Sequence, residues 1–302
     1  MKLLGFCTLL ILISGGLSAE ADFIRRGLEV IGDPHSVRLY DVNSSAILRE
    51  EALFNRRGQI KDRKSYTEDG AFQRHTRYQR DDRGNLKTVS AYNQAGDSLW
   101  RHEYRYQNAR LQQEIVYDAS AELNYTDLYS YDSDGNLLEL ARYASGGVPR
   151  WRTQYEHDSV QNRTLWTTYY SDGRLLRQGE EQYDQEGRLV REVHRDEVKE
   201  TYQEIRYAYD PQGRPISERI SDSDGSLLSV RRIRYDDSGN IVEEIESRFD
   251  GTVTRRVLYQ YRYDEHGNWI ERRVSERKKP QFGPVLTTER VHKRVIAYNG
   301  QG

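Results

Sequence analysis

The sequence has almost no cysteine. Cys7 is the only one among 302 residues, and it lies inside the first apolar stretch of the chain. A lipid-anchored protein would carry a cysteine directly after such a stretch, so Cys7 does not indicate lipidation. Once the leader is removed, the sequence offers no disulfide, no thiolate nucleophile and no cysteine-based metal site.

Long hydrophobic runs are missing after the N-terminus. The basic Lys2 is followed by an almost wholly apolar stretch, Leu3 to Ile13, and then by small residues that end at Ala19. This order is typical of a secretory signal peptide over residues 1–19, with cleavage after Ala19. The run is too short to remain as a transmembrane helix, and no later segment approaches about 18 apolar residues. We therefore predict a periplasmic or secreted bacterial protein that does not span a membrane.

An excess of basic residues is also absent. The formal net charge is −2, and removal of Lys2 makes it −3. Near-balance argues against a nucleic-acid partner, because such proteins usually show a basic excess. Hydrophobic residues make up only 36% of the chain, but 23 tyrosines distinguish it from a disordered one. The composition favours long, well-paired strands that are partly buried.

Catalytic and metal-binding motifs are absent as well. None of the seven histidines forms a His-x-His or His-Glu-x-x-His pattern, and there is no Gly-x-Ser-x-Gly elbow or phosphate-binding glycine loop. The segment Asp132 to Asn136 lacks the full ligand spacing of a calcium loop, so a hairpin turn explains it better. Adjacent acidic pairs such as Glu180-Glu181 face opposite sides of a strand. We predict no catalytic residue, metal site or cofactor, and we keep an exported hydrolase as a minor alternative.

The chain has instead a repeat of 26 residues. Gly187, Gly213 and Gly239 lie at this interval, and each closes a Tyr-Asp-x-x-Gly segment, which we call a main turn. A second series of glycines falls between the main turns, and we call these the intermediate turns. Turn signals every 12 to 14 residues predict short strands joined by tight turns, two strands to each unit.

The residues of these turns fit a specific geometry. In Asp210-Pro-Gln-Gly213, Asp and Pro suit the first two positions of a type I turn, and Gly suits the left-handed position that completes a hairpin with a bulge. Some copies have lost the glycine, although the phase of the repeat continues through them. These copies lie at Asn108-Ala109-Arg110, Ser120-Ala121, Gln161-Asn162 and residues 195–199.

The strands show a two-residue period, so that Tyr259, Tyr261 and Tyr263 share one face. An apolar residue recurs two places after each glycine. After the main turns these residues are Leu86, Leu137, Leu189, Ile241 and Trp269, and after the intermediate turns they are Phe72, Leu175, Leu227 and Val253. We predict that all of them lie on one aromatic and aliphatic face, opposite a face of Arg, Glu, Gln and Thr.

These patterns predict an all-β fold. Residues 49–275 form a repeat array, an antiparallel meander of about 17 strands that curls into a curved extended sheet or partial shell, with a two-layer sandwich as the alternative. Residues 20–48 are predicted to be an N-terminal cap, a short helix or irregular strand. Residues 276–302 form a wide turn and a closing strand over Leu286 to Tyr298. A lipid-embedded barrel is disfavoured, because both sides of Ile241 to Glu246 carry Glu.

The cadence Tyr-x-Tyr-Asp-x-x-Gly-Asn-Leu resembles the YD-repeat (RHS-repeat) family of bacterial surface and secreted proteins. The best copies are Tyr129 to Leu137, Tyr207 to Pro215 and Tyr261 to Trp269, and the resemblance covers residues 50 to 275. It implies a β-sheet array, which in large members forms shells that enclose a toxin or display a surface, with carbohydrate or cell-surface binding proposed for them. We find no following toxin domain, so the resemblance implies the fold more than a function.

The leading functional hypothesis is a non-enzymatic exported protein that binds a glycan or an envelope protein across an extended sheet. Aromatic rings can stack on sugars, so the candidate binding residues are Tyr207, Tyr209, Tyr259, Tyr261, Tyr263 and Trp269. A structural scaffold or spacer of an envelope assembly is the alternative. Buried tyrosines would favour the scaffold, and tyrosines displayed on a concave surface would favour binding.

Overall fold

A computed structural model describes residues 30–43, 45–280 and 283–300, so the predicted signal peptide lies outside the described residues. Apart from one short 3-10 turn at Ser145–Gly147, the regular structure of this part of the chain is β-strand. The strands are β1 (Pro34–Val42), β2 (Ala46–Phe54), β3 (Ile60–Tyr66), β4 (Phe72–Arg80), β5 (Leu86–Tyr92), β6 (Ser98–Gln107), β7 (Arg110–Tyr117), β8 (Leu123–Tyr131), β9 (Leu137–Ala144), β10 (Pro149–Asp158), β11 (Arg163–Tyr170), β12 (Leu175–Tyr183), β13 (Leu189–Asp196), β14 (Thr201–Tyr209), β15 (Pro215–Ser221), β16 (Leu227–Tyr235), β17 (Ile241–Arg248), β18 (Val253–Tyr263), β19 (Trp269–Lys278) and β20 (Leu286–Tyr298).

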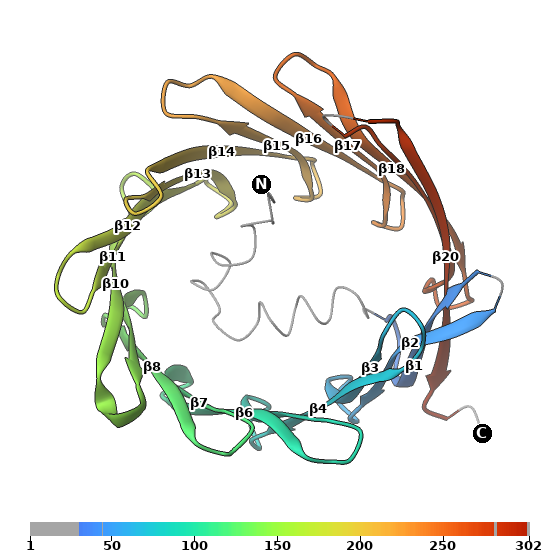
Figure 1. The fold of residues 1–302 in the computed structure, drawn as a ribbon, viewed down its shortest axis with the longest axis horizontal. Coiled ribbons are helices and arrows are strands. Elements are labelled where there is room, and N and C mark those ends of the chain that lie inside the picture. Colours follow the sequence, from blue (N-terminus) through green and yellow to red (C-terminus); the bar gives the residue numbers. More distant parts are fainter. Residues whose placement is uncertain (1–29, 44, 281–282, 301–302) are drawn as a thin grey trace.

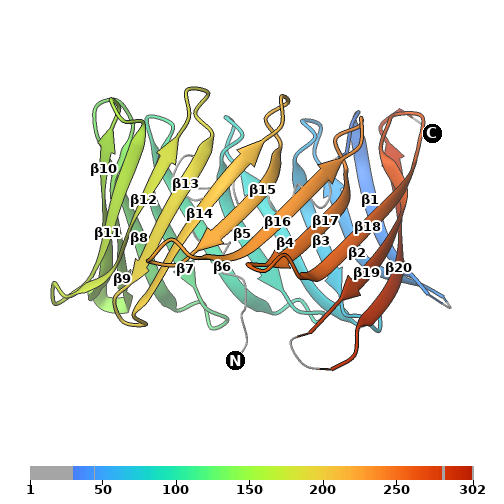
Figure 2. The ribbon, with the colours of Figure 1, turned by 90° about the horizontal axis from the view of Figure 1, so that it is seen from above.

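The strands form one antiparallel sheet that closes on itself. Each strand pairs with the next along the chain, and β1 pairs on its other side with β20, so that Val37 lies opposite both Ala52 and Ile296. Figures 1 and 2 show the resulting ring of tilted strands. The predicted all-β antiparallel meander is confirmed. The open curved sheet, the two-layer sandwich and the count of about 17 strands are corrected to a closed barrel of 20 strands, which leaves no sheet edge exposed.

The closure depends on a segment without repeat signals. Residues 34–42 fall within the predicted N-terminal cap, but they form the regular strand β1. Next to it, the Ile31 backbone N–H donates to Asn268 Oδ1 at 2.6 Å, and Asn268 Nδ2 donates back to the Ile31 carbonyl at 2.8 Å. These bonds join the start of the described chain to the last main turn. The predicted closing strand Leu286 to Tyr298 is confirmed as β20.

The main turns have the predicted geometry. The Gly213 N–H donates to the Asp210 carbonyl at 2.9 Å, and the Asp210 carboxylate accepts from the backbone N–H groups of Gln212 and Arg214. Gly213 has φ of +79°, a conformation that costs glycine little because it has no Cβ. The copies without glycine also use positive φ, and the copy at Asn108-Ala109 does so at both residues of a two-residue turn. Positive φ occurs there at Asn108, Ala109, Ala121, Asn162 and Glu200.

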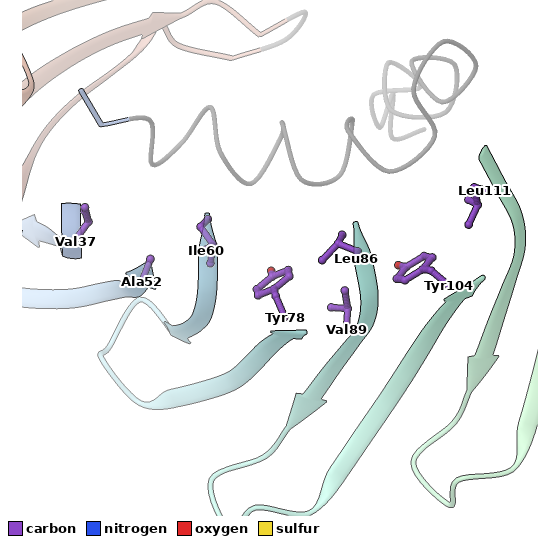
Figure 3. Close-up of a cluster of buried hydrophobic side chains, with 8 residues drawn as sticks. All are labelled: Val37, Ala52, Ile60, Tyr78, Leu86, Val89, Tyr104 and Leu111. Carbon is purple, nitrogen blue, oxygen red and sulfur yellow. The ribbon is translucent and has the colours of Figure 1, made fainter. Parts of the chain in front are cut away.

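A β-bulge lies next to most turns. It changes the face of the sheet on which the first residues after the turn lie. Leu86, after a main turn, lies in a buried cluster that points into the ring, together with Tyr78 and Val89 (Figure 3). Phe72, after an intermediate turn, pairs with Tyr66 beyond a register shift, and both rings lie on the outer wall. The prediction that both series of apolar residues share one face is therefore wrong. A bulge adds one residue to one strand and reverses the alternation beyond it.

The ring of strands is wide. Twenty strands at a spacing of about 4.8 Å and a tilt of about 40° give a barrel about 40 Å across between opposite backbones. None of the strands in the described part of the chain crosses this ring. The side chains that face the interior are therefore the surface on which a partner inside the barrel would lie.

The left-handed turn position provides a stability test. Replacing Gly213 with Ala should lower the free energy of unfolding by about 1 kcal/mol, because a Cβ disfavours this φ. An added Cβ at Gly213 would meet no atom within 4 Å, so the cost is conformational. The reverse change, Ala121→Gly, should raise it by up to about 1 kcal/mol.

Chemical denaturation would measure both changes. Ala208→Gly, within strand β14, is the control and should destabilise. A stabilising effect of Gly213→Ala would contradict the assignment of the turn.

Candidate functional site

The six predicted binding residues all lie half-buried on the inner wall. Tyr207 and Tyr209 belong to β14, whereas Tyr259, Tyr261 and Tyr263 belong to β18 and Trp269 begins β19. The register shows that these side chains point into the ring. Tyr259 lies two residues from the buried Val257 and therefore shares its face, and Val257 pairs with Glu244, which is also buried. The structure brings the last four together and places Tyr207 and Tyr209 four strands away.

One tyrosine of the Tyr-x-Tyr-Asp motif bonds to the neighbouring strand. It is the second tyrosine in most copies and the first, Tyr261, in the last copy, whose second tyrosine is Tyr263. Its hydroxyl donates to the carbonyl of the residue twenty positions earlier, as in Tyr209 to Leu189 at 2.6 Å and Tyr261 to Ile241 at 2.9 Å. The backbone ladder between β13 and β14 ends at Arg191, short of Leu189. The hydroxyl thus satisfies a carbonyl that the ladder leaves without a partner. The same bond occurs in Tyr131 to Leu111 and Tyr235 to Pro215.

The tyrosine two positions before the one that reaches the carbonyl donates to a glutamate fifteen positions earlier. Tyr259 donates to Glu244 Oε1 at 2.7 Å, and Tyr207 donates to Glu192. Burial raises the pKa of Tyr259, and the hydrogen bond to Glu244 adds to the rise. In the same way, burial raises the pKa of Tyr261 to about 12. These tyrosines therefore stay protonated and act as hydrogen-bond donors over the physiological pH range.

The aromatic residues at β18 and β19 form a continuous row. Ring centroids are 6.4 Å apart for Tyr259 and Tyr261, 6.0 Å for Tyr261 and Tyr263, and 6.4 Å for Tyr261 and Trp269. Two guanidinium groups lie against the indole, with Arg294 Cζ at 3.8 Å and Arg272 Cζ at 5.0 Å from the Trp269 ring centroid. These four aromatic residues and the two arginines stand next to the closure of the barrel. We call the six residues together the seam row.

Carboxylates form a second layer on the inner wall. Glu181 on β12 and Glu192 on β13 are directly paired in register and both are buried. Tyr183 and Tyr207 donate to them, and His194 lies 3.2 Å from Glu192. Burial raises the pKa of Glu181, and the charge of Glu192 adds to the rise, against the lowering effect of the Tyr183 hydrogen bond.

Sequence reasoning missed this carboxylate layer and the arginines of the seam row. Glu181 and Glu192 look like ordinary charged positions of a strand, and their pairing depends on the register of two strands. Arg294 stands at the position that tyrosine occupies in regular copies, and its Nε donates to the Trp269 carbonyl at 2.8 Å. The signal in the sequence that could have indicated Arg294 was this replacement of a repeat tyrosine by arginine.

The outer wall carries charges that form pairs across the strands. Glu243 accepts from Arg234 at 2.9 Å and from Arg256 at 2.6 Å. Glu271 lies 3.1 Å from Arg273 and 3.2 Å from Arg262. Burial alone would raise the pKa of Glu243, but the hydrogen bonds from Arg256 and Arg234 outweigh it and lower that pKa.

Two further observations concern the parts of the chain that the structure describes. There, no group of three or more His, Cys, Asp or Glu side chains is arranged to hold a metal ion. No helix within residues 30–43, 45–280 and 283–300 is long and apolar enough to cross a membrane.

Comparisons with known proteins identify no family for this chain. No family model matches it, and no curated protein is similar to it in sequence. Among solved structures, a porin-like protein from Bacteroides uniformis ATCC 8492 is 10% identical, with a TM-score of 0.37 over 89% of this chain and 98% of that one. A porin-like protein from Bacteroides vulgatus ATCC 8482 is 14% identical, with a TM-score of 0.29 over 89% of this chain and 100% of that one.

A third similar structure is TcdB2-TccC3 without its hypervariable C-terminal region. It is 14% identical, with a TM-score of 0.22 over 80% of this chain and 18% of that one. Similarities at this level carry no argument about function.

The hydroxyl bond of the repeat tyrosines can be tested by removing it alone. Tyr209→Phe keeps the ring and leaves the Leu189 carbonyl without its donor, so we expect the free energy of unfolding to fall by about 1 kcal/mol. Tyr143→Phe is the matched control, because Tyr143 lies on the outer wall with no hydroxyl bond to a described residue. Equal losses for the two variants in denaturant titrations would show that the hydroxyl bond does not matter.

The buried carboxylates predict a stability that depends on pH. A raised folded-state pKa means that ionised Glu181 destabilises the barrel above that pKa, and this cost disappears below the unfolded value of about 4.3. Glu181→Gln should therefore raise the melting temperature by about 2 °C at pH 7 and change little at pH 4.

Glu243→Gln is the opposite case. Its pKa is lowered in the folded state, so its charge stabilises at neutral pH and this contribution is lost as the pH falls. The variant should melt lower than the parent at pH 7, and the two should converge in acid. Thermal melts from pH 3.5 to 8 would show both trends, and a lower melting temperature for Glu181→Gln at pH 7 would refute the first.

Proposed function

We propose that this protein is an exported, non-enzymatic barrel of the YD-repeat type that binds a carbohydrate chain on its inner wall at the seam row. The observation that carries the proposal is the continuous set of rings Tyr259, Tyr261, Tyr263 and Trp269, half-buried and facing the interior. Such rings offer apolar contact area with little loss of side-chain entropy, which suits them to binding surfaces.

The hydrogen bonds of the row decide which groups remain for a ligand. The hydroxyls of Tyr259, Tyr261 and Tyr263 already donate to Glu244, Ile241 and Asp236. Recognition therefore rests on ring contacts with the C–H groups of a sugar, and on hydrogen bonds from Arg272. This combination favours a glycan that offers C–H faces to the rings and hydrogen-bond acceptors to Arg272.

The outer wall supports an aqueous setting. Glu243 and Glu271 lie on the outward side of their strands, each with two arginines. A charged residue on the lipid side of a membrane barrel costs about 2–4 kcal/mol near the bilayer centre for Arg or Lys. We therefore infer that water surrounds the barrel, in the periplasm or outside the cell.

The carboxylates do not favour catalysis. Glu192 accepts from Tyr207, Glu244 from Tyr259 and Arg231, and Glu218 from Arg231. These contacts stabilise the strands they connect. We propose that these inner-wall acids are structural, and we keep the exported hydrolase as a minor alternative.

A scaffold without a small ligand is the second candidate. The observation that favours it is the regular bonding of repeat tyrosines to the preceding strand, which gives each ring a structural role. In this case the seam row would rigidify the closure of the barrel. The two candidates differ in whether removal of one ring affects binding.

The test compares two tryptophans of the inner wall. Trp269→Ala should weaken glycan binding at least tenfold, since it removes the largest ring of the row. Trp151→Ala on β10 is the matched control, because Trp151 also faces inward with an arginine, Arg142, at 5.1 Å from its ring. A glycan array would identify the ligand, and calorimetry would measure the affinities of the mature chain.

Three outcomes would contradict parts of the proposal. A blank glycan array together with a blank pull-down from envelope extract would favour the scaffold. Equal binding by Trp269→Ala and Trp151→Ala would remove the seam row from the site. A mature chain that stays in solution only with detergent would overturn the aqueous setting.

A further inference from the structure

A depression of about 420 Å³ lies on the outer wall, away from the seam row. It is formed where β3, β4 and the end of β5 meet the following intermediate turn. Its lining consists of Lys64, Tyr66, Phe72, His75, Arg77, Tyr92, Asn93, Gln94 and Gly96. The volume falls in the range of about 300–1,000 Å³ that is usual for small-molecule sites.

The register places these side chains outside the barrel. Lys64 pairs with His75, and His75 pairs with Tyr92 on the next strand. The adjacent residue Thr76 pairs with Ala91 and lies on the other face with Tyr78, which points inward (Figure 3). The depression is therefore separated from the inner wall by the sheet itself.

Aromatic rings form the apolar part of the depression. Tyr66 and Phe72 meet edge to face with centroids 5.9 Å apart. The Tyr92 ring lies 6.1 Å from the His75 ring, and Arg77 Cζ lies 5.6 Å from the Tyr92 centroid. These half-buried rings present flat surfaces on which a ring-shaped ligand can stack.

The polar part of the depression is positively charged. Two of its nine described lining residues, Lys64 and Arg77, carry a positive charge, and none of the nine is acidic. The nearest carboxylates already have partners, since Glu51 accepts from Arg38 at 2.7 Å and Asp62 lies 2.9 Å from His75.

Lys64 and Arg77 keep much of their binding capacity. Lys64 Nζ lies 3.6 Å from Glu51, and Arg77 Nε lies 3.5 Å from Asp62, both longer than a strong charged hydrogen bond. Their side chains are 43% and 50% exposed. An anion that enters the depression can therefore approach both groups at little desolvation cost.

Comparison with the next copy of the repeat shows that the fold does not require these residues. Twenty-six positions further on, Lys64, Phe72 and Arg77 correspond to Ser90, Ser98 and Glu103. The register is the same in the two copies, with Ser90 opposite Arg101 as Lys64 is opposite His75. At the position of Phe72, later copies carry Leu123, Pro149 and Leu175. Because the same strands form with other residues at these positions, the repeat fold does not require these three side chains.

We propose that this depression binds a sugar ring that carries a carboxylate. The carboxylate lies between Lys64 and Arg77, and the C–H face of the sugar packs on Tyr66 and Phe72. The turn residue Gln94 supplies an amide for the hydroxyl groups. Positive charge selects against neutral sugars, and the aromatic rings select against small inorganic anions, so both properties are needed for recognition.

The test uses trigalacturonate as the probe and the neutral trisaccharide maltotriose as its control, titrated into the mature protein by calorimetry. The parent protein should bind trigalacturonate at least tenfold more tightly than maltotriose, and the affinity should fall with added salt. Lys64→Ser, Phe72→Ser and Arg77→Glu introduce the residues of the next copy, which the fold accepts. Each should weaken trigalacturonate binding at least fivefold. Thermal melting checks that each variant is folded at the temperature of the titration, since Phe72→Ser loses the contact with Tyr66 and Arg77→Glu faces Asp62.

Two controls separate this site from the seam row. Arg101→Gln, on the outer wall of the next copy, should leave trigalacturonate binding unchanged. Trp269→Ala should also leave it unchanged, so a failure of the seam row and a failure of this site are distinguishable.

Three outcomes would overturn the proposal. The first is no binding of trigalacturonate by the parent protein. The second is unaltered binding by Arg77→Glu. The third is equal or tighter binding of a tetraglutamate peptide, which would show that negative charge alone is recognised.

Discussion

The barrel depends on a hydrogen bond from a tyrosine side chain to a backbone carbonyl in the neighbouring strand. Two antiparallel strands joined by an intermediate turn separate at the opposite rim of the barrel. There, the backbone pairing between them ends before it reaches the first residue of the earlier strand, as it does before Leu189 at the start of β13. The Tyr209 hydroxyl reaches that carbonyl at 2.6 Å. Where the tyrosine is lost, His157 makes the equivalent bond to the Leu137 carbonyl at 2.7 Å. A recurrent bond at one rim therefore holds a wide sheet together without disulfides.

The two walls of the barrel use charge differently. On the inner wall, carboxylates such as Glu181 and Asp127 are buried, and burial raises the pKa of both. On the outer wall, arginines surround Glu243 and lower its pKa against the effect of burial. Ionised Glu181 thus costs stability, whereas Glu243 stabilises the sheet. Glu244 shows that an inner carboxylate can also be stabilising, because hydrogen bonds from Tyr259 and Arg231 lower its pKa against the effect of burial.

Departures from the repeat mark the two places where we propose function. Regular copies devote their tyrosines to strand pairing, so their rings have a structural cause. Arg294 replaces a repeat tyrosine and lies against Trp269, and Phe72 adds a ring where other copies have Ser98 or Leu123. Since neighbouring copies fold without them, the repeat itself does not require these residues. Proposed ligand sites on opposite walls can then act independently, because the sheet separates them.

The sequence by itself determined the turns, the strands and the antiparallel order, because these depend on residues close together in the chain. Gly213 and Asp210 show this, since the turn they form uses only its own atoms and those of neighbouring residues. The tertiary structure alone decided the closure, the direction of each face and the grouping of the candidate residues. Closure pairs Val37 with Ile296, a contact without any local signal, and each bulge reverses the alternation beyond it, as at Phe72. For the same reason, the sequence grouped Tyr207 with Tyr259, although four strands separate them.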